Sequence, residues 1–271
     1  MPTTLVRRTV LTASALSLTL LASACGGSGS ADGKADGKAG AKADAKPSAS
    51  ASPSAPAAPA APAAKGKTDA ELAGMILVQA DLPDHLFKAV SEQDVKAGEG
   101  AVSDVPDCLP VLQGMASAPI GHPTGAARIA VAAKPKPVAK DASEEDKRLA
   151  AHNALGATAT VVSLYSYDGD GAERVFRSLE DAGLPCEKGF VATVEGEQLG
   201  NTTVRPFTKV EVGDESLTYT LAMADEEIGR ISTELVVVRK ANTLAVFHAQ
   251  SMSGTADHPK DVVEAQAGKL G

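Results

Sequence analysis

The sequence from residue 235 to residue 247 reads LVVVRKANTLAVF. Its first four residues are branched and apolar, which is typical of a buried strand. A second apolar run, Thr243–Phe247, follows after only four residues. Arg239-Lys240-Ala241-Asn242 is therefore predicted to form the turn of an antiparallel β-hairpin.

Similar runs on both sides of this hairpin predict more strands. The expected ranges are 86–90, 127–132, 158–167, 203–212, 217–224, 229–239 and 244–252. The later strands are joined by short connections, and such connections favour antiparallel pairing of neighbours. The segment 133–148 has prolines and a run of charges, and we interpret it as a long surface loop.

The best helical pattern lies between Ala172 and Ala182. Its apolar residues are spaced at i, i+3, i+4, i+7 and i+10, and a glycine and a proline follow it. Thr68-Asp69-Ala70-Glu71 has the spacing of a capping box and opens a predicted helix that ends near Asp81. A short helix at 108–112 and a last helix after Pro259 complete the pattern. The predicted fold class is α+β, with an antiparallel sheet of about five to seven strands and helices mainly on one side.

The first 25 residues are typical of an export signal. Arg7 and Arg8 precede an apolar, uncharged run, Thr9–Leu21, which is too short to span a membrane. The next residues, Leu21-Ala22-Ser23-Ala24-Cys25, resemble the lipobox of bacterial lipoproteins, although Ala22 stands where leucine is commonest. The resemblance implies cleavage after residue 24 and a diacylglycerol, with fatty acids such as palmitate, on Cys25. A plain secretory signal is the alternative.

The export route and the domain organisation follow from the same end of the chain. Arg7-Arg8-Thr9-Val10-Leu11 resembles the twin-arginine signal, but Sec signals also carry basic pairs, so both routes stay open. Residues 26–67 hold only Ala, Gly, Pro, Ser, Lys and Asp, so they have no aromatic or branched aliphatic side chain to bury. The first half is predicted to be a flexible coil and the Ala-Pro half to be stiffer. We expect a signal peptide at 1–24, a lipidated cysteine with a disordered tether at 25–67, and one extracytoplasmic domain at 68–271.

The charge excludes several partners. The chain has a formal net charge of −8, and residues 68–271 alone hold 18 basic and 31 acidic residues, a net of −13. An acidic domain is a poor partner for nucleic acid or for an anionic membrane surface. The expected membrane contact is therefore the lipid on Cys25.

Two cysteines, Cys108 and Cys186, remain beside Cys25. In an oxidising compartment such a pair is predicted to form a disulfide, here across a separation of 78 residues. The alternative is a catalytic thiol, but no histidine lies in a recognisable cysteine-protease context.

No sequence motif supports a metal site, a cofactor site or another catalytic site. The five histidines lack metal-binding spacing, so neither a metal nor a cofactor is predicted. Gly196–Gly200 lacks the pattern of a phosphate loop, and the folded part has no serine acyl-transfer motif. Asp225-Glu226-Glu227 is interpreted as a solvated turn.

The order of these elements resembles actinobacterial lipoproteins related to the extracellular sensor domain of membrane serine/threonine kinases. The residues behind the resemblance are the helix at 172–182 followed by Cys186, and the antiparallel run with Gly213-Asp214-Glu215-Ser216 and a Val-Val-Val-Arg strand. The resemblance implies a helix pinned by a disulfide on an antiparallel sheet, and a cleft for a small ligand.

Two functions are therefore expected. The first is a non-enzymatic binding or sensor-like module whose partner is a small molecule or an envelope protein. The alternative is a cell-envelope hydrolase without a recognisable site motif. Candidates for the polar lining of a cleft on the sheet are Tyr165, Tyr167, Arg205, Tyr219, Arg239 and His248.

Overall fold

A computed structural model describes residues 64–135, 137–208, 210–225, 229–251 and 254–271. All of them belong to one compact unit, Ala58–Gly271. The export signal, Cys25 and the tether up to residue 63 lie outside the described residues, as do Glu226, Glu227 and Met252.

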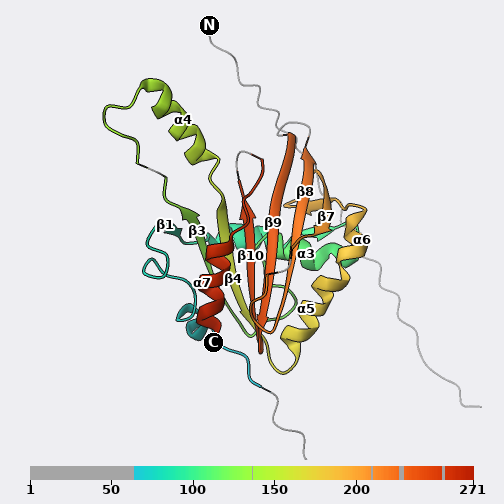
Figure 1. Cartoon of the computed structure of the whole chain (residues 1–271). Helices are drawn as coiled ribbons and strands as arrows, with labels where there is room; N and C mark the ends of the chain where they lie inside the picture. Colours follow the sequence, from blue (N-terminus) through green and yellow to red (C-terminus); the bar gives the residue numbers. More distant parts are fainter. Residues whose placement is uncertain (1–63, 136, 209, 226–228, 252–253) are drawn as a thin grey trace, which may run out of the picture. The chain divides into compact units, whose positions relative to one another are not determined.

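Seven antiparallel strands form the main sheet, in the order β1-β3-β4-β10-β9-β8-β7 (Figure 1). Their bounds are β1 His85–Lys88, β3 Gly125–Ala133, β4 Ala159–Ser166, β7 Asn201–Pro206, β8 Glu215–Asp225, β9 Gly229–Lys240 and β10 Thr243–Gln250. The α+β class with an antiparallel sheet is confirmed.

The hairpin of β9 and β10 lies near the middle of the sheet. Lys240 pairs with Thr243, so Ala241 and Asn242 alone form the turn. Ala241 has a φ of 51°, the left-handed conformation that tight hairpin turns need. The carboxylate of Asp214 accepts a hydrogen bond of 2.7 Å from the backbone N–H of Ala241 and holds this turn. The predicted hairpin is confirmed.

Helices cover both faces of the sheet. The larger core lies under α3 (Leu109–Met115), α5 (Gly171–Asp181) and α6 (Gly183–Glu187), and a smaller one lies under α1 (Asp69–Ala73) and α7 (Lys260–Leu270). Leu235 and Val237 of β9 point into the larger core, whereas Val236 and Val238 point into the smaller one. Burial on both faces explains why β9 has an unbroken run of branched residues.

Three helices were missed by the sequence patterns, among them α6, which begins at Gly183, directly after the predicted helix at 172–182. The predicted loop at 133–148 is wrong in its second half, because α4 (Glu144–Leu155) begins there, with Ser143 Oγ accepting a hydrogen bond from the N–H of Asp146. Figure 1 shows α4 standing away from the sheet on the connection between β3 and β4. Its side chains are mostly exposed, so it has no apolar stripe that periodicity could reveal. The third missed helix is α2 (Glu92–Glu99).

Two predicted elements are shorter than expected. The capping box at Thr68 is present, but α1 ends at Ala73 because Gly74 caps it. The strand predicted at 203–212 ends at Pro206, and Val210 and Val212 then pack onto the smaller core.

A second, three-stranded sheet lies beside the main one. Its order is β2-β5-β6, with β2 at Val102–Ser103, β5 at Ala192–Val194 and β6 at Glu197–Gln198. A short 3-10 helix, η1 (Pro106–Cys108), connects β2 to α3. None of these strands was predicted.

Residues 64–67, expected to be tether, instead bind the folded domain, and we call them the strap. Gly169 donates a backbone hydrogen bond of 2.7 Å to the carbonyl of Ala64, and the N–H of Gly66 donates one of 2.8 Å to Asp168 Oδ1. Lys67 donates from its backbone to Ser166 Oγ and from its ammonium group to the hairpin turn of β9 and β10. The folded domain therefore begins before Thr68.

Within the described ranges, no helix is long and apolar enough to cross a membrane.

Candidate functional site

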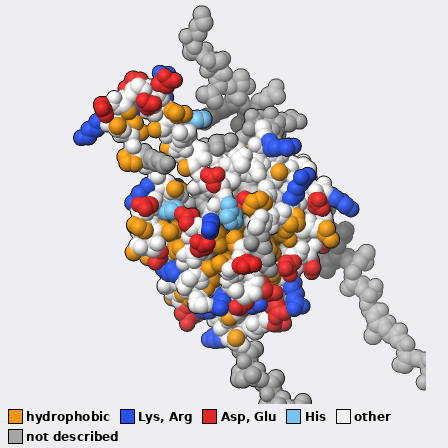
Figure 2. All heavy atoms as spheres, in the orientation of Figure 1, with side chains coloured by type: hydrophobic (Ala, Val, Ile, Leu, Met, Phe, Trp, Pro, Cys, Tyr) orange, Lys and Arg blue, Asp and Glu red, His pale blue; other side chains and the backbone are white. Residues whose placement is uncertain are grey.

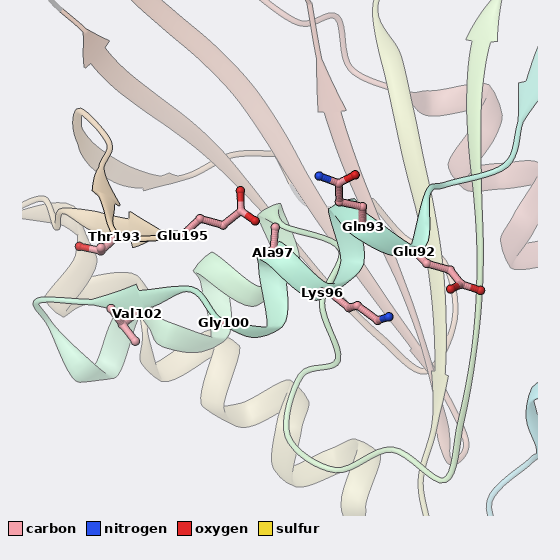
Figure 3. A pocket seen from close by; sticks show the side chains of 9 residues that line it. Glu92, Gln93, Lys96, Ala97, Gly100, Val102, Thr193 and Glu195 are labelled. Carbon is pink, nitrogen blue, oxygen red and sulfur yellow. The ribbon is translucent and has the colours of Figure 1, made fainter. Parts of the chain in front are cut away.

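A groove of about 710 Å³ lies between α2 and the three-stranded sheet (Figure 3). Five lining residues come from α2 and its C-cap, and four from the sheet and its turn. They are Glu92, Gln93, Lys96, Ala97, Gly100, Val102, Thr193, Glu195 and Gly196. A volume of this size lies within the range of small-molecule sites.

Strand alternation builds the wall on the sheet side. Val102 and Thr193 are directly paired, so their side chains share one face of the sheet. Ala192 and Val194, on either side of Thr193, contact the larger core instead. Thr193 is thereby turned toward the groove, together with Val102, a residue that is 57% exposed.

The turn between β5 and β6 carries a carboxylate on the rim of the groove. It consists of Glu195 and Gly196, with φ values of 50° and 87°. Two successive residues with positive φ make a type I′ turn, which usually takes Asn or Gly. Figure 3 shows Glu195 reaching from this turn toward Ala97 of α2.

Helix α2 forms the other wall, and a glycine holds it in place. Ser91 caps the helix by accepting a hydrogen bond of 3.1 Å from the N–H of Asp94. Gly98 packs on the end of α3: a Cβ atom there would lie 2.7 Å from the carbonyl oxygen of Ala116. Only a residue without a side chain allows α2 to come this close, which sets the position of the wall.

The disulfide joins the two segments that lead to the sheet wall. Cys108 and Cys186 are both fully buried and bonded, with a Cα–Cα distance of 5.7 Å. Cys108 follows β2, and Cys186 precedes β5. Next to the disulfide, Val191 donates a hydrogen bond of 2.7 Å to Asp104 Oδ1, and the N–H of Asp104 bonds the carbonyl of Val191. These bonds fix β2 against β5.

A second hollow, of about 380 Å³, lies at the N-terminal end of α5. Its lining includes His122, Asp168, Arg174 and Ser178. The carboxylate of Asp168 already accepts a hydrogen bond from the backbone N–H of Gly66 in the strap. Ser178 donates to a carbonyl of its own helix, so several polar groups of this hollow are used within the fold.

The three candidate tyrosines are core residues whose hydroxyl groups bond the backbone. Tyr165 donates to the carbonyls of Ser117 and Ala118, at 2.9 and 2.7 Å, and Tyr167 donates to Ile120 at 2.8 Å. Tyr219 bonds the carbonyl of Leu179 on α5 at 2.8 Å. Burial raises the pKa of all three, that of Tyr219 to about 12. Tyr167 also lines the smaller hollow.

The other three candidates are far apart in the sheet. Arg205 is exposed on the edge strand β7. Arg239 forms ion pairs with Glu215 and Asp214 at the turn end of β9. The six residues therefore do not line one cleft, because alternation along the strands and pairing within the fold separate them.

His248 is buried within the sheet. It is 8% exposed on β10, and burial lowers its pKa to about 4. Its Nε2 atom lies 3.3 Å from Thr233 Oγ1, which is also buried. A pair so deep in the sheet stabilises packing and does not reach the groove.

Two histidine–carboxylate pairs were missed by sequence reasoning. His258 Nδ1 lies 2.6 Å from Glu234 Oε2, and His85 Nε2 lies 3.1 Å from Asp261 Oδ2. His258 lies just before α7 and Asp261 lies in it. Each pair therefore connects this C-terminal segment to a strand of the main sheet, β9 or β1. Figure 2 shows acidic, basic and histidine side chains interspersed on one face of the molecule. Within the part of the chain that is described, no three His, Cys, Asp or Glu side chains gather as metal ligands.

The chain is similar in structure to the extracellular domain of a kinase. The extracellular domain of PknH from Mycobacterium tuberculosis matches with a TM-score of 0.44 at 11% sequence identity, over 76% of this chain and 95% of that one. No protein-family model matches the chain, and no curated protein matches it. At this level of similarity, only the chain's own residues can indicate a function.

Proposed function

We propose that the protein is a lipid-anchored, extracytoplasmic, non-enzymatic binding module that takes its ligand in the groove between α2 and the three-stranded sheet. The observation that carries this proposal is the groove of about 710 Å³. The Cys108–Cys186 disulfide covalently joins the two segments that lead to its sheet wall. A pre-formed wall lowers the entropy that binding costs.

The disulfide also supports the location. Disulfides persist in oxidising compartments and are rare in the cytosol. The pattern Leu21-Ala22-Ser23-Ala24-Cys25 adds the expectation of a lipid on Cys25. Two or more acyl chains would give stable attachment, whereas a single chain is marginal.

Filling the groove tests the binding function. Gly100 accepts a side chain without a clash, since a Cβ atom there would approach other atoms no closer than 3.7 Å. Gly100→Phe should place a ring in the groove. Gly268→Phe is the matched control, because a Cβ atom at Gly268, on α7, meets nothing within 4 Å.

The readout is the melting temperature with and without the small-molecule fraction of the cell envelope. A ligand at about 100 times its Kd stabilises by about 2.7 kcal/mol, and each kcal/mol is worth about 2–4 °C for a domain of this size. The wild type and Gly268→Phe should shift upward, and Gly100→Phe should not. An equal shift in Gly100→Phe would place binding outside the groove.

Lipid attachment has its own test. Cells fed radiolabelled palmitate should yield a labelled, membrane-bound protein, and Cys25→Ala should be unlabelled and either released or unprocessed. A Cys25→Ala protein that stays labelled on the membrane would contradict the anchor.

A further inference from the structure

Helix α4 projects from the folded domain and is exposed along most of its surface. Figures 1 and 2 show it standing away from the sheet, on the connection between β3 and β4. It has 12 residues, and isolated helices shorter than about 12–15 residues are only marginally stable in water. Its own support is the cap at Ser143 and the ion pair of Lys147 with Glu144, which both add little. Contact with a partner would therefore stabilise α4.

The most apolar point of the exposed surface is Leu149, in the middle of the helix. It is 57% exposed. Residues three and four positions away share its face, because the helix turns once in about 3.6 residues. Before the leucine these residues are Glu145 and Asp146. After it they are His152 and Asn153, and all four are exposed. Carboxylates thus lie on one side of Leu149, and groups with N–H donors lie at the same spacing on the other side.

This face is complementary to a second copy of itself. In an antiparallel pair of α4 helices with a two-fold axis at Leu149, residues equally far before and after the leucine come opposite each other. Asp146 of one copy then faces His152 of the other. Glu145 of one copy faces Asn153 of the other. In a parallel pair, each carboxylate would instead face its own copy and repel it.

The opposed groups suit each other chemically. The chain itself holds an imidazole against a carboxylate where His258 Nδ1 lies 2.6 Å from Glu234 Oε2. Asp146 accepts a hydrogen bond from Ser143 at Oδ2, and a carboxylate can accept several. Antiparallel helices also bring the positive end of each helix dipole beside the negative end of the other. The polar contacts and the dipoles therefore favour the same arrangement.

An anionic membrane surface is a poorer partner for this face. Two carboxylates would be repelled by it, and one leucine offers too little apolar area for insertion. A pair of helices about 18 Å long makes a small interface, so association is weak in dilute solution.

We propose that α4 is a self-association surface through which two copies of this chain pair, antiparallel and two-fold symmetric about Leu149. The projection of α4 from the sheet leaves this face open to a second chain. The inference does not depend on the groove or on its ligand.

Disulfide trapping of the purified full chain tests this pairing. Leu149→Cys places a thiol on the two-fold axis, where it meets the thiol of the second copy. Ala151→Cys is the matched control, because Ala151 is also exposed on α4 but lies on the opposite side of the helix. After mild oxidation, Leu149→Cys should give about tenfold more linked dimer than Ala151→Cys, since pairing raises the effective thiol concentration. The parent chain shows any dimer that forms through Cys25.

A charge exchange tests the antiparallel arrangement. Asn153→Glu, added to Leu149→Cys, sets two glutamates against each other at both ends of the pair. Trapping should fall about two- to fivefold, because two like-charge contacts form. Mixing this chain with one that carries Glu145→Lys and Leu149→Cys should restore a mixed dimer, since lysine then faces glutamate. Circular dichroism checks that every variant is folded.

Three results would overturn the inference. Equal trapping of Leu149→Cys and Ala151→Cys would mean that dimers form by random collision. An absence of linked dimer from Leu149→Cys would mean that the two copies do not meet at α4. Trapping at residue 149 that Asn153→Glu leaves unchanged would refute the antiparallel pairing.

Discussion

Replacing Gly66 with alanine should loosen the strap and destabilise the folded domain. A Cβ atom at this position would lie 1.9 Å from Thr124 Oγ1 and 2.9 Å from the carbonyl carbon of Tyr167. The threonine side chain can rotate away. The backbone of Tyr167, directly after β4, cannot move without disturbing the sheet, so the strap has to lift.

The cost follows from the hydrogen bonds that the strap makes. Lifting it breaks the bond from Gly66 to Asp168, at 2.8 Å, and the bond from Lys67 to Ser166 Oγ, at 2.9 Å. It also removes the acceptor of the Asn242 side chain, the carbonyl of Lys65 at 2.8 Å. Each bond is worth about 1 kcal/mol net, and the freed residues regain some conformational entropy. We expect a loss of about 1–2 kcal/mol.

Urea denaturation followed by circular dichroism measures this difference. Gly268→Ala is the matched control: its Cβ atom meets nothing within 4 Å, and alanine in a helix is favoured over glycine by up to about 1 kcal/mol. The two glycine-to-alanine changes should therefore have opposite signs. If Gly66→Ala is as stable as the wild type, the strap does not contribute to the fold.

Three more perturbations test the packing. Since the pKa of His248 is about 4 when folded and 6.5 when exposed, the unfolded chain binds a proton that the folded chain does not, and stability falls as pH drops from 6.5 to 4. Urea midpoints should show the wild type losing about 2 kcal/mol more than His248→Gln between pH 7 and pH 5, and equal losses would contradict the burial. Tyr219→Phe should cost about 1–2 kcal/mol in the same assay, because the carbonyl of Leu179 loses its donor; no change would mean that water replaces the hydroxyl. Cys108→Ala with Cys186→Ala should cost roughly 4–5 kcal/mol or less for a loop of 78 residues, and free thiols in the unreduced wild type would argue against the bond.

Periodicity predicted the parts of the fold that bury apolar faces. The β9–β10 hairpin and α5 follow from residues such as Val236 and Phe176, whose spacing reports which side faces a core. Helix α4 was not predicted because its mostly exposed side chains form no apolar stripe. Ser143, with Asp146 three residues later, was nevertheless a usable signal of a helix N-cap.

The groove could not be predicted in the same way. β2 and β6 have two residues each, too few to show alternation. The turn at Glu195 carries a side chain that propensity disfavours there, so the local sequence did not indicate a hairpin. Gly98 allows the close packing of α2 on α3, and nothing local reveals which helix it meets.

The tyrosine candidates illustrate a limit of reasoning from polarity. A tyrosine in a strand can line a cleft or can bury its ring and donate its hydroxyl to a carbonyl. Tyr165 and Tyr219 do the latter, and their partners lie 47–48 and 39–40 residues away along the chain. Such partners are known only once the helices are placed on the sheet.

We infer that the Cys108–Cys186 disulfide holds the groove in its binding shape. Hydrogen exchange read by mass spectrometry, on the oxidised and the mildly reduced chain, measures whether it does. Reduction should speed exchange mainly in residues 92–104 and 190–198, which form the two walls, and leave the hairpin of β9 and β10 protected. Unchanged exchange in both wall segments, or an equal rise in the hairpin, would contradict the claim.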